Sequence, residues 1–87
     1  AIVNMRKMGT IVDVRTREEF EGGHIINSIN IPLQEIMNHI EDIKSMESPI
    51  IFCCASGVRS EHAANYFKTI GITCENGGGW SNLERKL

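Results

Sequence analysis

The sequence Cys53-Cys54-Ala55-Ser56-Gly57-Val58-Arg59-Ser60 follows the short apolar run Pro49-Ile50-Ile51-Phe52 and precedes a helix-like segment. The apolar run is β-branched and begins with proline, which predicts a buried strand. Beyond Ser60, apolar residues recur at helical spacing, at Ala63, Ala64, Phe67 and Ile70. The predicted order is therefore a strand, a tight loop and a helix.

A loop that ends at a helix N-terminus points unpaired backbone N–H groups at whatever it encloses, and the helix dipole adds positive potential there. Cys54 begins this loop and Arg59 ends it. Cations and helix N-termini lower the pKa of a cysteine by several units from roughly 8.5. The pattern favours a nucleophilic thiolate in an anion-binding loop. In the alternative interpretation, Cys54 is a small packing residue and Arg59 is solvated.

Two further motifs accompany the loop. The first is Ile11-Val12-Asp13-Val14-Arg15-Thr16-Arg17-Glu18-Glu19-Phe20, followed by Gly23-His24-Ile25 and Ser28-Ile29-Asn30-Ile31-Pro32. The second is Gly77-Gly78-Gly79-Trp80. In this order and at these separations, the three motifs resemble a rhodanese-homology domain, a single-domain sulfurtransferase module, over nearly the whole chain. The resemblance implies an α/β, three-layer rhodanese-like fold with a central parallel sheet flanked by helices, built as one domain over residues 1–87.

The alternation of strands and helices along the chain also predicts a parallel sheet between helices. We expect strands over 10–14, 28–31, 49–52 and 72–75, with a further short edge strand at Ile2-Val3. We expect helices over 18–23, from Leu33 to the region of Lys44, and beyond Ser60, with a last amphipathic segment from Trp80. The second helix is predicted to bury one apolar face, consisting of Leu33, Ile36, Met37, Ile40 and Ile43.

Asp13 and Arg15 end the first predicted strand, and in open α/β sheets that end of the strands faces the ligand crevice. The resemblance implies that both residues support the active loop from beneath or beside it, together with Ser60. Asp13 has a second interpretation as a cap for the following turn, where Thr16 and Glu19 form a capping-box pattern.

The remaining cysteines and His24 are predicted to be structural. Side chains alternate along a strand, so Cys53 packs where Cys54 faces the loop. For Cys74 we expect core packing, with a resolving thiol as the alternative. His24 is expected to fix a turn through a backbone hydrogen bond rather than to act as a general base, and Trp80 to plug the core rather than to line a pocket.

Composition excludes several classes of function. The chain has 87 residues, a net charge of −2 and a pI near 5.9, which gives no basic surface for nucleic acid. No apolar stretch approaches the roughly 20 residues of a membrane-spanning helix, and no cysteine pair has the spacing of a zinc site. We therefore expect no metal, no nucleic acid and no membrane partner. Three cysteines without a disulfide pattern favour a reducing, cytoplasmic location.

The resemblance implies a sulfurtransferase that needs no cofactor beyond a covalent Cys54 persulfide. The donor would be thiosulfate, a persulfide or a polysulfide, and the acceptor a thiol, cyanide or a protein cysteine. Backbone N–H groups of the loop residues Ala55, Ser56, Gly57, Val58 and Arg59 would bind the anionic sulfur, as an oxyanion hole does. The loop carries no cation besides Arg59, which favours a donor of low charge.

Two other functions remain open at this point. Phosphatases that share the rhodanese fold have a loop one residue longer, and the six residues from Cys54 to Arg59 count against them. A catalytically silent rhodanese-like module used for binding or regulation is the second alternative. Such modules commonly lack the loop cysteine, whereas Cys54 is present.

Overall fold

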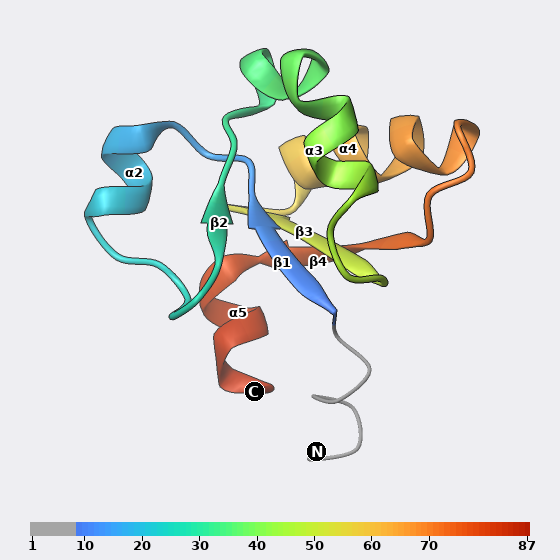
Figure 1. Cartoon of the computed structure of the whole chain (residues 1–87). Helices are drawn as coiled ribbons and strands as arrows, with labels where there is room; N and C mark the ends of the chain where they lie inside the picture. Colours follow the sequence, from blue (N-terminus) through green and yellow to red (C-terminus); the bar gives the residue numbers. More distant parts are fainter. Residues whose placement is uncertain (1–8) are drawn as a thin grey trace.

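The computed structural model describes residues 9–87, so the strand expected at Ile2-Val3 lies outside the described residues. Within that range a parallel sheet has the strand order β2-β1-β3-β4 (Figure 1). The strands are β1 (Thr10–Asp13), β2 (Ile29–Asn30), β3 (Ile50–Cys54) and β4 (Cys74–Gly79). The strand order reverses between β1 and β3, which is where ligands bind in open parallel sheets.

Helices cover both faces of the sheet, as expected. They are α2 (Arg17–Glu21), the 3₁₀ helix η1 (Leu33–His39), α3 (Ile40–Lys44), α4 (Val58–Thr69) and α5 (Trp80–Arg85). In Figure 1, α3 and α4 lie above the sheet and α5 lies below it. The predicted three-layer α/β architecture is therefore confirmed. Within the described residues, no helix combines the length and the apolar character needed to cross a membrane.

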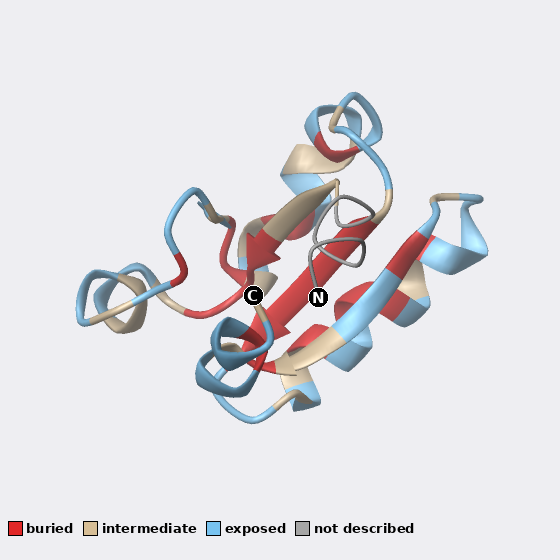
Figure 2. Ribbon diagram, turned by 90° about the horizontal axis from the view of Figure 1, so that it is seen from below, coloured by how far each residue is buried: buried red, intermediate tan, exposed pale blue. Residues whose placement is uncertain are grey.

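The core lies on both sides of β3, whose five residues are all buried. Successive side chains of a strand point to opposite faces, so Phe52 and Cys54 join the larger cluster beneath α4, and Ile51 and Cys53 join the cluster against α5. Figure 2 shows this burial along the central strands. The alternation directs the two adjacent cysteines into different layers.

The segment after Pro32 differs from the expected helix. It begins as the 3₁₀ helix η1 and becomes α-helical only at Ile40. A 3₁₀ helix has three residues per turn instead of 3.6, which changes the positions that share a face. Ile36 is buried, but Met37 is 55% exposed. The prediction that Met37 fills the core is therefore wrong.

The last strand also differs from its expected range of 72–75, since β4 runs from Cys74 through the three glycines to Gly79. Glycine has a low strand propensity, but packing overrides it here. A Cβ atom on Gly77 would lie 2.7 Å from Cγ2 of Ile51 and 3.0 Å from Cδ2 of Leu83. The absence of a side chain at Gly77 lets β4 lie close to Ile51 of β3 and Leu83 of α5.

Candidate active-site loop

The loop between β3 and α4 lies at the carboxyl end of the sheet, where the motifs predict the site. Ala55 and Ser56 are exposed, Gly57 is the N-cap of α4, and Val58 begins the helix with 59% of its side chain exposed. Gly57 has a φ of 102°, in the region that favours glycine. A Cβ atom at this position would lie 3.1 Å from Cα of Gly78. The loop is therefore packed closely against β4.

Cys54 ends β3 with its sulfur directed into this loop, and its side chain is fully buried. The backbone N–H of Gly57 donates to Sγ of Cys54 at 3.0 Å, and Oγ of Ser60 lies 3.4 Å from the same sulfur. Burial raises the pKa of the Cys54 thiol, but hydrogen bonds from the Ser60 side chain and from backbone N–H groups of the loop outweigh it. The pKa of Cys54 therefore lies below its ordinary value, which favours the thiolate.

Arg59 pairs with Glu19 of α2 rather than pointing freely into the loop. Its Nη1 and Nη2 atoms donate to the two carboxylate oxygens of Glu19 at 2.8 and 3.0 Å. The hydrogen bonds from Arg59 and from Thr16 hold the pKa of Glu19 at about 2. The positive charge of Arg59 is thus largely neutralised by Glu19, a partner that the sequence analysis did not identify.

The predicted capping box at Thr16 is confirmed, and it fixes Glu19. The Thr16 hydroxyl accepts from the backbone N–H of Glu19, while Glu19 Oε1 accepts from the backbone N–H of Thr16. The same oxygen of Glu19 binds Arg59. One carboxylate therefore caps α2 and joins it to α4.

Asp13 and Arg15 form a buried ion pair beside this arrangement, with 0% and 4% of their surface exposed. Arg15 donates from Nε and Nη2 to the Asp13 carboxylate at 2.7 to 3.0 Å. It also donates to the backbone oxygens of Glu19 and Gly23. The pair holds α2 and the following turn, and so reaches the loop indirectly, through the contact of Glu19 with Arg59.

Asn76 of β4 is a second residue that the sequence analysis missed. Its Oδ1 accepts from the Ser60 hydroxyl at 2.6 Å and from the backbone N–H of Gly78 at 2.9 Å. Its Nδ2 donates to the backbone oxygen of Gly57 at 3.0 Å. Ser60 itself is fully buried. Through Gly57 and Ser60, Asn76 joins β4 to the N-terminal end of α4.

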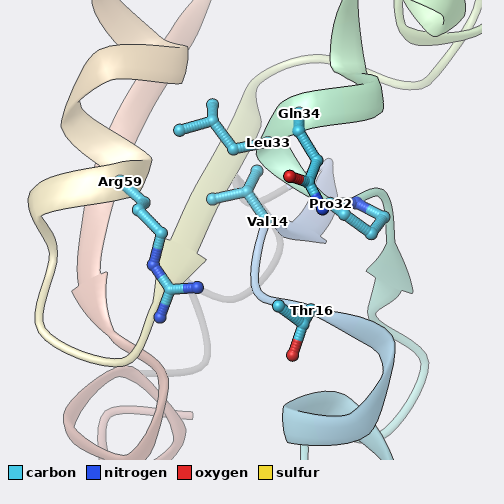
Figure 3. A pocket seen from close by; sticks show the side chains of 6 residues that line it. All are labelled: Val14, Thr16, Pro32, Leu33, Gln34 and Arg59. Atoms are coloured by element: carbon cyan, nitrogen blue, oxygen red, sulfur yellow. The ribbon is translucent and has the colours of Figure 1, made fainter.

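An open pocket of about 240 Å³ lies next to the loop. It is lined by Val14, Thr16, Pro32, Leu33, Gln34 and Arg59. Figure 3 shows Arg59 on one side of this space, with Pro32 and Gln34 across from it. The lining residues follow β1, β2 and β3, so the pocket opens at the carboxyl ends of the central strands. Apolar groups dominate its lining, and Arg59 is its charged member.

The residues expected to be structural occupy structural positions. The Nδ1 atom of His24 lies 2.7 Å from the backbone oxygen of Phe20, and the two rings stack with centroids 3.7 Å apart. Phe20 is itself partly buried. Trp80 packs against the core cluster of Ile25, Ile51, Cys53 and Leu83. The Arg15 guanidinium lies 4.8 Å from the centre of its ring, and this position agrees with the expected core plug.

The two other cysteines are also packing residues, as predicted. Burial and the neighbouring Asp13 carboxylate raise the pKa of Cys53 to about 12. Cys74 is buried, its Sγ donates to the backbone oxygen of Ala64 at 3.4 Å, and burial raises its pKa. Of the three thiols, Cys54 is the one whose surroundings favour ionisation.

Comparison with known proteins places these features in a family. The sequence profile described as "Rhodanese-like domain" matches residues 2–86. The uncharacterized protein YqhL of Bacillus subtilis is 38% identical over 63 residues, which are 72% of this chain and 49% of YqhL. The thiosulfate sulfurtransferase GlpE of Shewanella oneidensis is 33% identical over 67 residues, which are 77% of this chain and 59% of GlpE.

Among solved structures, a rhodanese-like domain protein from Staphylococcus aureus matches with a TM-score of 0.79 at 32% identity, covering 95% of this chain and 83% of that chain. The chain spans less than two thirds of the length of either curated relative, YqhL or GlpE.

Proposed function

The chain belongs to the rhodanese-like domain family, and we propose that it transfers sulfane sulfur through a persulfide on Cys54. The observation that carries this proposal is the environment of the Cys54 sulfur. It accepts the backbone N–H of Gly57 at 3.0 Å, and its pKa is lowered although the side chain is buried. A thiolate held by backbone donors is a suitable nucleophile for covalent catalysis.

In the first step, the Cys54 thiolate attacks the outer sulfur of the donor. A new S–S bond forms on Cys54 while the S–S bond of the donor breaks. The leaving group departs as sulfite from thiosulfate, as a thiolate from a persulfide, or as a polysulfide anion one sulfur shorter from a polysulfide. The electron pair of the broken bond leaves with that group, so no external oxidant or reductant is needed. Backbone N–H groups of the loop stabilise the negative charge on the new persulfide.

In the second step, an acceptor nucleophile attacks the terminal sulfur of the Cys54 persulfide. Cyanide gives thiocyanate, and a small thiol or a protein cysteine gives a new persulfide. The S–S bond on Cys54 breaks and its thiolate is regenerated, stabilised again by Gly57 and Ser60. The transfer is thus divided into two displacements at sulfur.

The pairing of Arg59 with Glu19 supports a donor of low charge. Because Glu19 binds Nη1 and Nη2 of Arg59 at 2.8 and 3.0 Å, a dianion such as thiosulfate meets a cation that is already compensated. The pocket beside Arg59 is mostly apolar in its lining. We therefore propose a persulfide or polysulfide as the better donor, with thiosulfate as a weak one.

The full burial of Cys54 is the observation that favours the alternative, a silent binding module. Because Cys54 is fully buried, transfer requires the loop to move so that a donor reaches the sulfur. In a silent module the loop stays closed over Cys54 and the pocket beside Arg59 binds a partner without chemistry.

A sulfurtransferase assay separates the two functions. Purified protein is given thiosulfate or polysulfide as donor and cyanide as acceptor, and thiocyanate is measured. We expect thiocyanate production that Cys54→Ser abolishes and that Cys53→Ser, a matched change at the adjacent buried thiol, leaves in place. Production that persists in Cys54→Ser, or none with either donor in the folded wild type, contradicts the proposal.

A further inference from the structure

The Ser60 hydroxyl has one hydrogen and two neighbours that compete for it. Oγ of Ser60 lies 2.6 Å from Oδ1 of Asn76 and 3.4 Å from Sγ of Cys54. A hydroxyl donates once and accepts through its lone pairs. The direction of this hydrogen decides whether Ser60 stabilises the Cys54 thiolate or accepts from the Cys54 thiol.

The backbone fixes which atom of the Asn76 amide faces Ser60. The Gly57 carbonyl accepts only, so the Asn76 atom 3.0 Å from it must be the donating Nδ2. The Gly78 N–H donates only, so the Asn76 atom 2.9 Å from it must be the accepting Oδ1. That oxygen is also the atom next to Ser60, and it has no hydrogen to give. Ser60 must therefore be the donor in this contact.

We propose that Asn76 is a positioning residue for Cys54, because it takes the Ser60 hydrogen and leaves the Ser60 oxygen as an acceptor facing the Cys54 sulfur. In the thiol form, the Cys54 S–H donates to Ser60 and Ser60 donates to Asn76. When Cys54 loses its proton, the Ser60 hydroxyl turns from Asn76 to the sulfur. Asn76 thus competes with the Cys54 thiolate for the Ser60 hydrogen and limits how far the loop lowers the pKa of Cys54.

This inference rests on the proposed role of Cys54 as the nucleophile and adds a residue that sets its reactivity. The other ionisable groups that interact electrostatically with Cys54 are Arg59 on α4 and Cys53 on β3, and neither contacts Asn76 through a hydrogen bond given by the structure. A change at Asn76 therefore acts on Cys54 through Ser60 or through the backbone of the loop.

The test measures the rate at which iodoacetamide alkylates Cys54 as a function of pH, with the modified peptide identified by mass spectrometry. In Asn76→Ala the Ser60 hydroxyl is free to donate to the thiolate. We expect the midpoint of the rate profile to fall by about one pH unit, the order of a single hydrogen bond to a charged group. In Asn76→Asp, which keeps an acceptor for Ser60 and adds a negative charge, we expect the midpoint to rise.

Two comparisons separate this role from a structural one. Both Asn76 variants lose the donor to the Gly57 carbonyl, so loosening of the loop would shift their midpoints in the same direction. In a Ser60→Ala background, Asn76→Ala is expected to produce no shift. A shift of equal size in that background, or no fall in Asn76→Ala alone, overturns the proposal. Asn65→Ala, at an exposed position of α4, serves as the unshifted control.

Alkylation reports the ionisation of Cys54 whether or not sulfur is transferred. The shifts expected in the Asn76 variants, combined with a wild type that never forms a persulfide, would refute the proposed function and leave the role of Asn76 standing. Persulfide formation without those shifts would do the reverse.

Discussion

Replacing Glu19 by glutamine changes the charge that a donor meets beside the loop. In the wild type the Glu19 carboxylate binds Arg59 through both oxygens, at 2.8 and 3.0 Å. Glu19→Gln removes that negative charge while keeping the length of the side chain and one acceptor oxygen. Arg59 then presents its full positive charge at the pocket that it lines.

The size of the effect follows from the exposure of the pair. The side chains of Arg59 and Glu19 are 35% and 37% exposed, so their field is screened by water. Two unit charges 4 Å apart interact by about 1 kcal/mol in water, and less at longer range in salt. For a dianion at a somewhat longer distance we estimate about 1 kcal/mol in total, which corresponds to a fall of about fivefold in the KM for thiosulfate. A persulfide with one negative charge gains about half of that energy, a fall of about twofold.

The assay is steady-state sulfur transfer to cyanide, with thiosulfate and a small alkyl persulfide compared at low and high salt. Glu41→Gln is the matched control, because it removes the same charge from a surface pair with Lys44 on α3. We expect no change in KM for that variant. An unchanged thiosulfate KM in folded Glu19→Gln, or an equal fall in Glu41→Gln, would refute the reasoning that the pairing of Arg59 limits the charge of the donor.

Three further predictions concern the thiol, the loop and the buried ion pair. Because the pKa of Cys54 is lowered, its thiolate persists below the pKa of a free cysteine, about 8.5, and its alkylation rate falls only as the pH drops through the lower value. The pKa values of Cys53 and Cys74 are raised, so mass spectrometry of peptides from the alkylated folded protein is expected to find both thiols unmodified. Modification of either thiol before Cys54 would contradict this assignment. Gly57→Ala combines a left-handed backbone with a contact at 3.1 Å, so we expect it to lose about 1 to 3 kcal/mol in the free energy of unfolding and to lose sulfur transfer. The control Gly71→Ala, with φ of 88° and open space around it, is expected to lose stability alone. Equal sulfur-transfer activity in the two variants would argue against a role for the loop backbone. Asp13→Ala leaves the buried Arg15 guanidinium without its carboxylate and is expected to lower the free energy of unfolding, measured with denaturant, by about 3 to 5 kcal/mol. The control Asp42→Ala, at an exposed position, is expected to lower it by no more than about 0.5 kcal/mol. Similar losses in both variants would show that the buried pair contributes no more to stability than a surface carboxylate.

The features that were predictable from the sequence are those that local chemistry determines. The run of apolar residues before Cys54 and the helical spacing after Ser60 predict β3 and α4, because each pattern is contained in a few neighbouring residues. The capping box of Thr16 and Glu19 spans three positions, and the contact of His24 with Phe20 spans four. Such features need no knowledge of the tertiary structure.

The features that were missed depend on segments far apart in the chain. Glu19 and Arg59 are 40 positions apart, and Ser60 and Asn76 are 16 apart. Their pairing follows from the packing of α2 and β4 against the loop, which no local pattern contains. The extension of β4 through Gly77 has the same origin. Glycine is unfavourable in strands, but at this position the side chains of Ile51 and Leu83 leave no space for a Cβ atom. A glutamate in the capping box was visible, but its second contact was not.

The mass of the intact protein shows whether Cys54 carries sulfur as a persulfide. Wild type, Cys54→Ser and Cys53→Ser are each measured before and after exposure to thiosulfate or polysulfide. We expect a gain of one sulfur atom, about 32 Da, in the wild type and in Cys53→Ser, and no gain in Cys54→Ser. If the folded wild type gains no adduct with either donor, or if an adduct survives in Cys54→Ser, sulfur is not carried on Cys54.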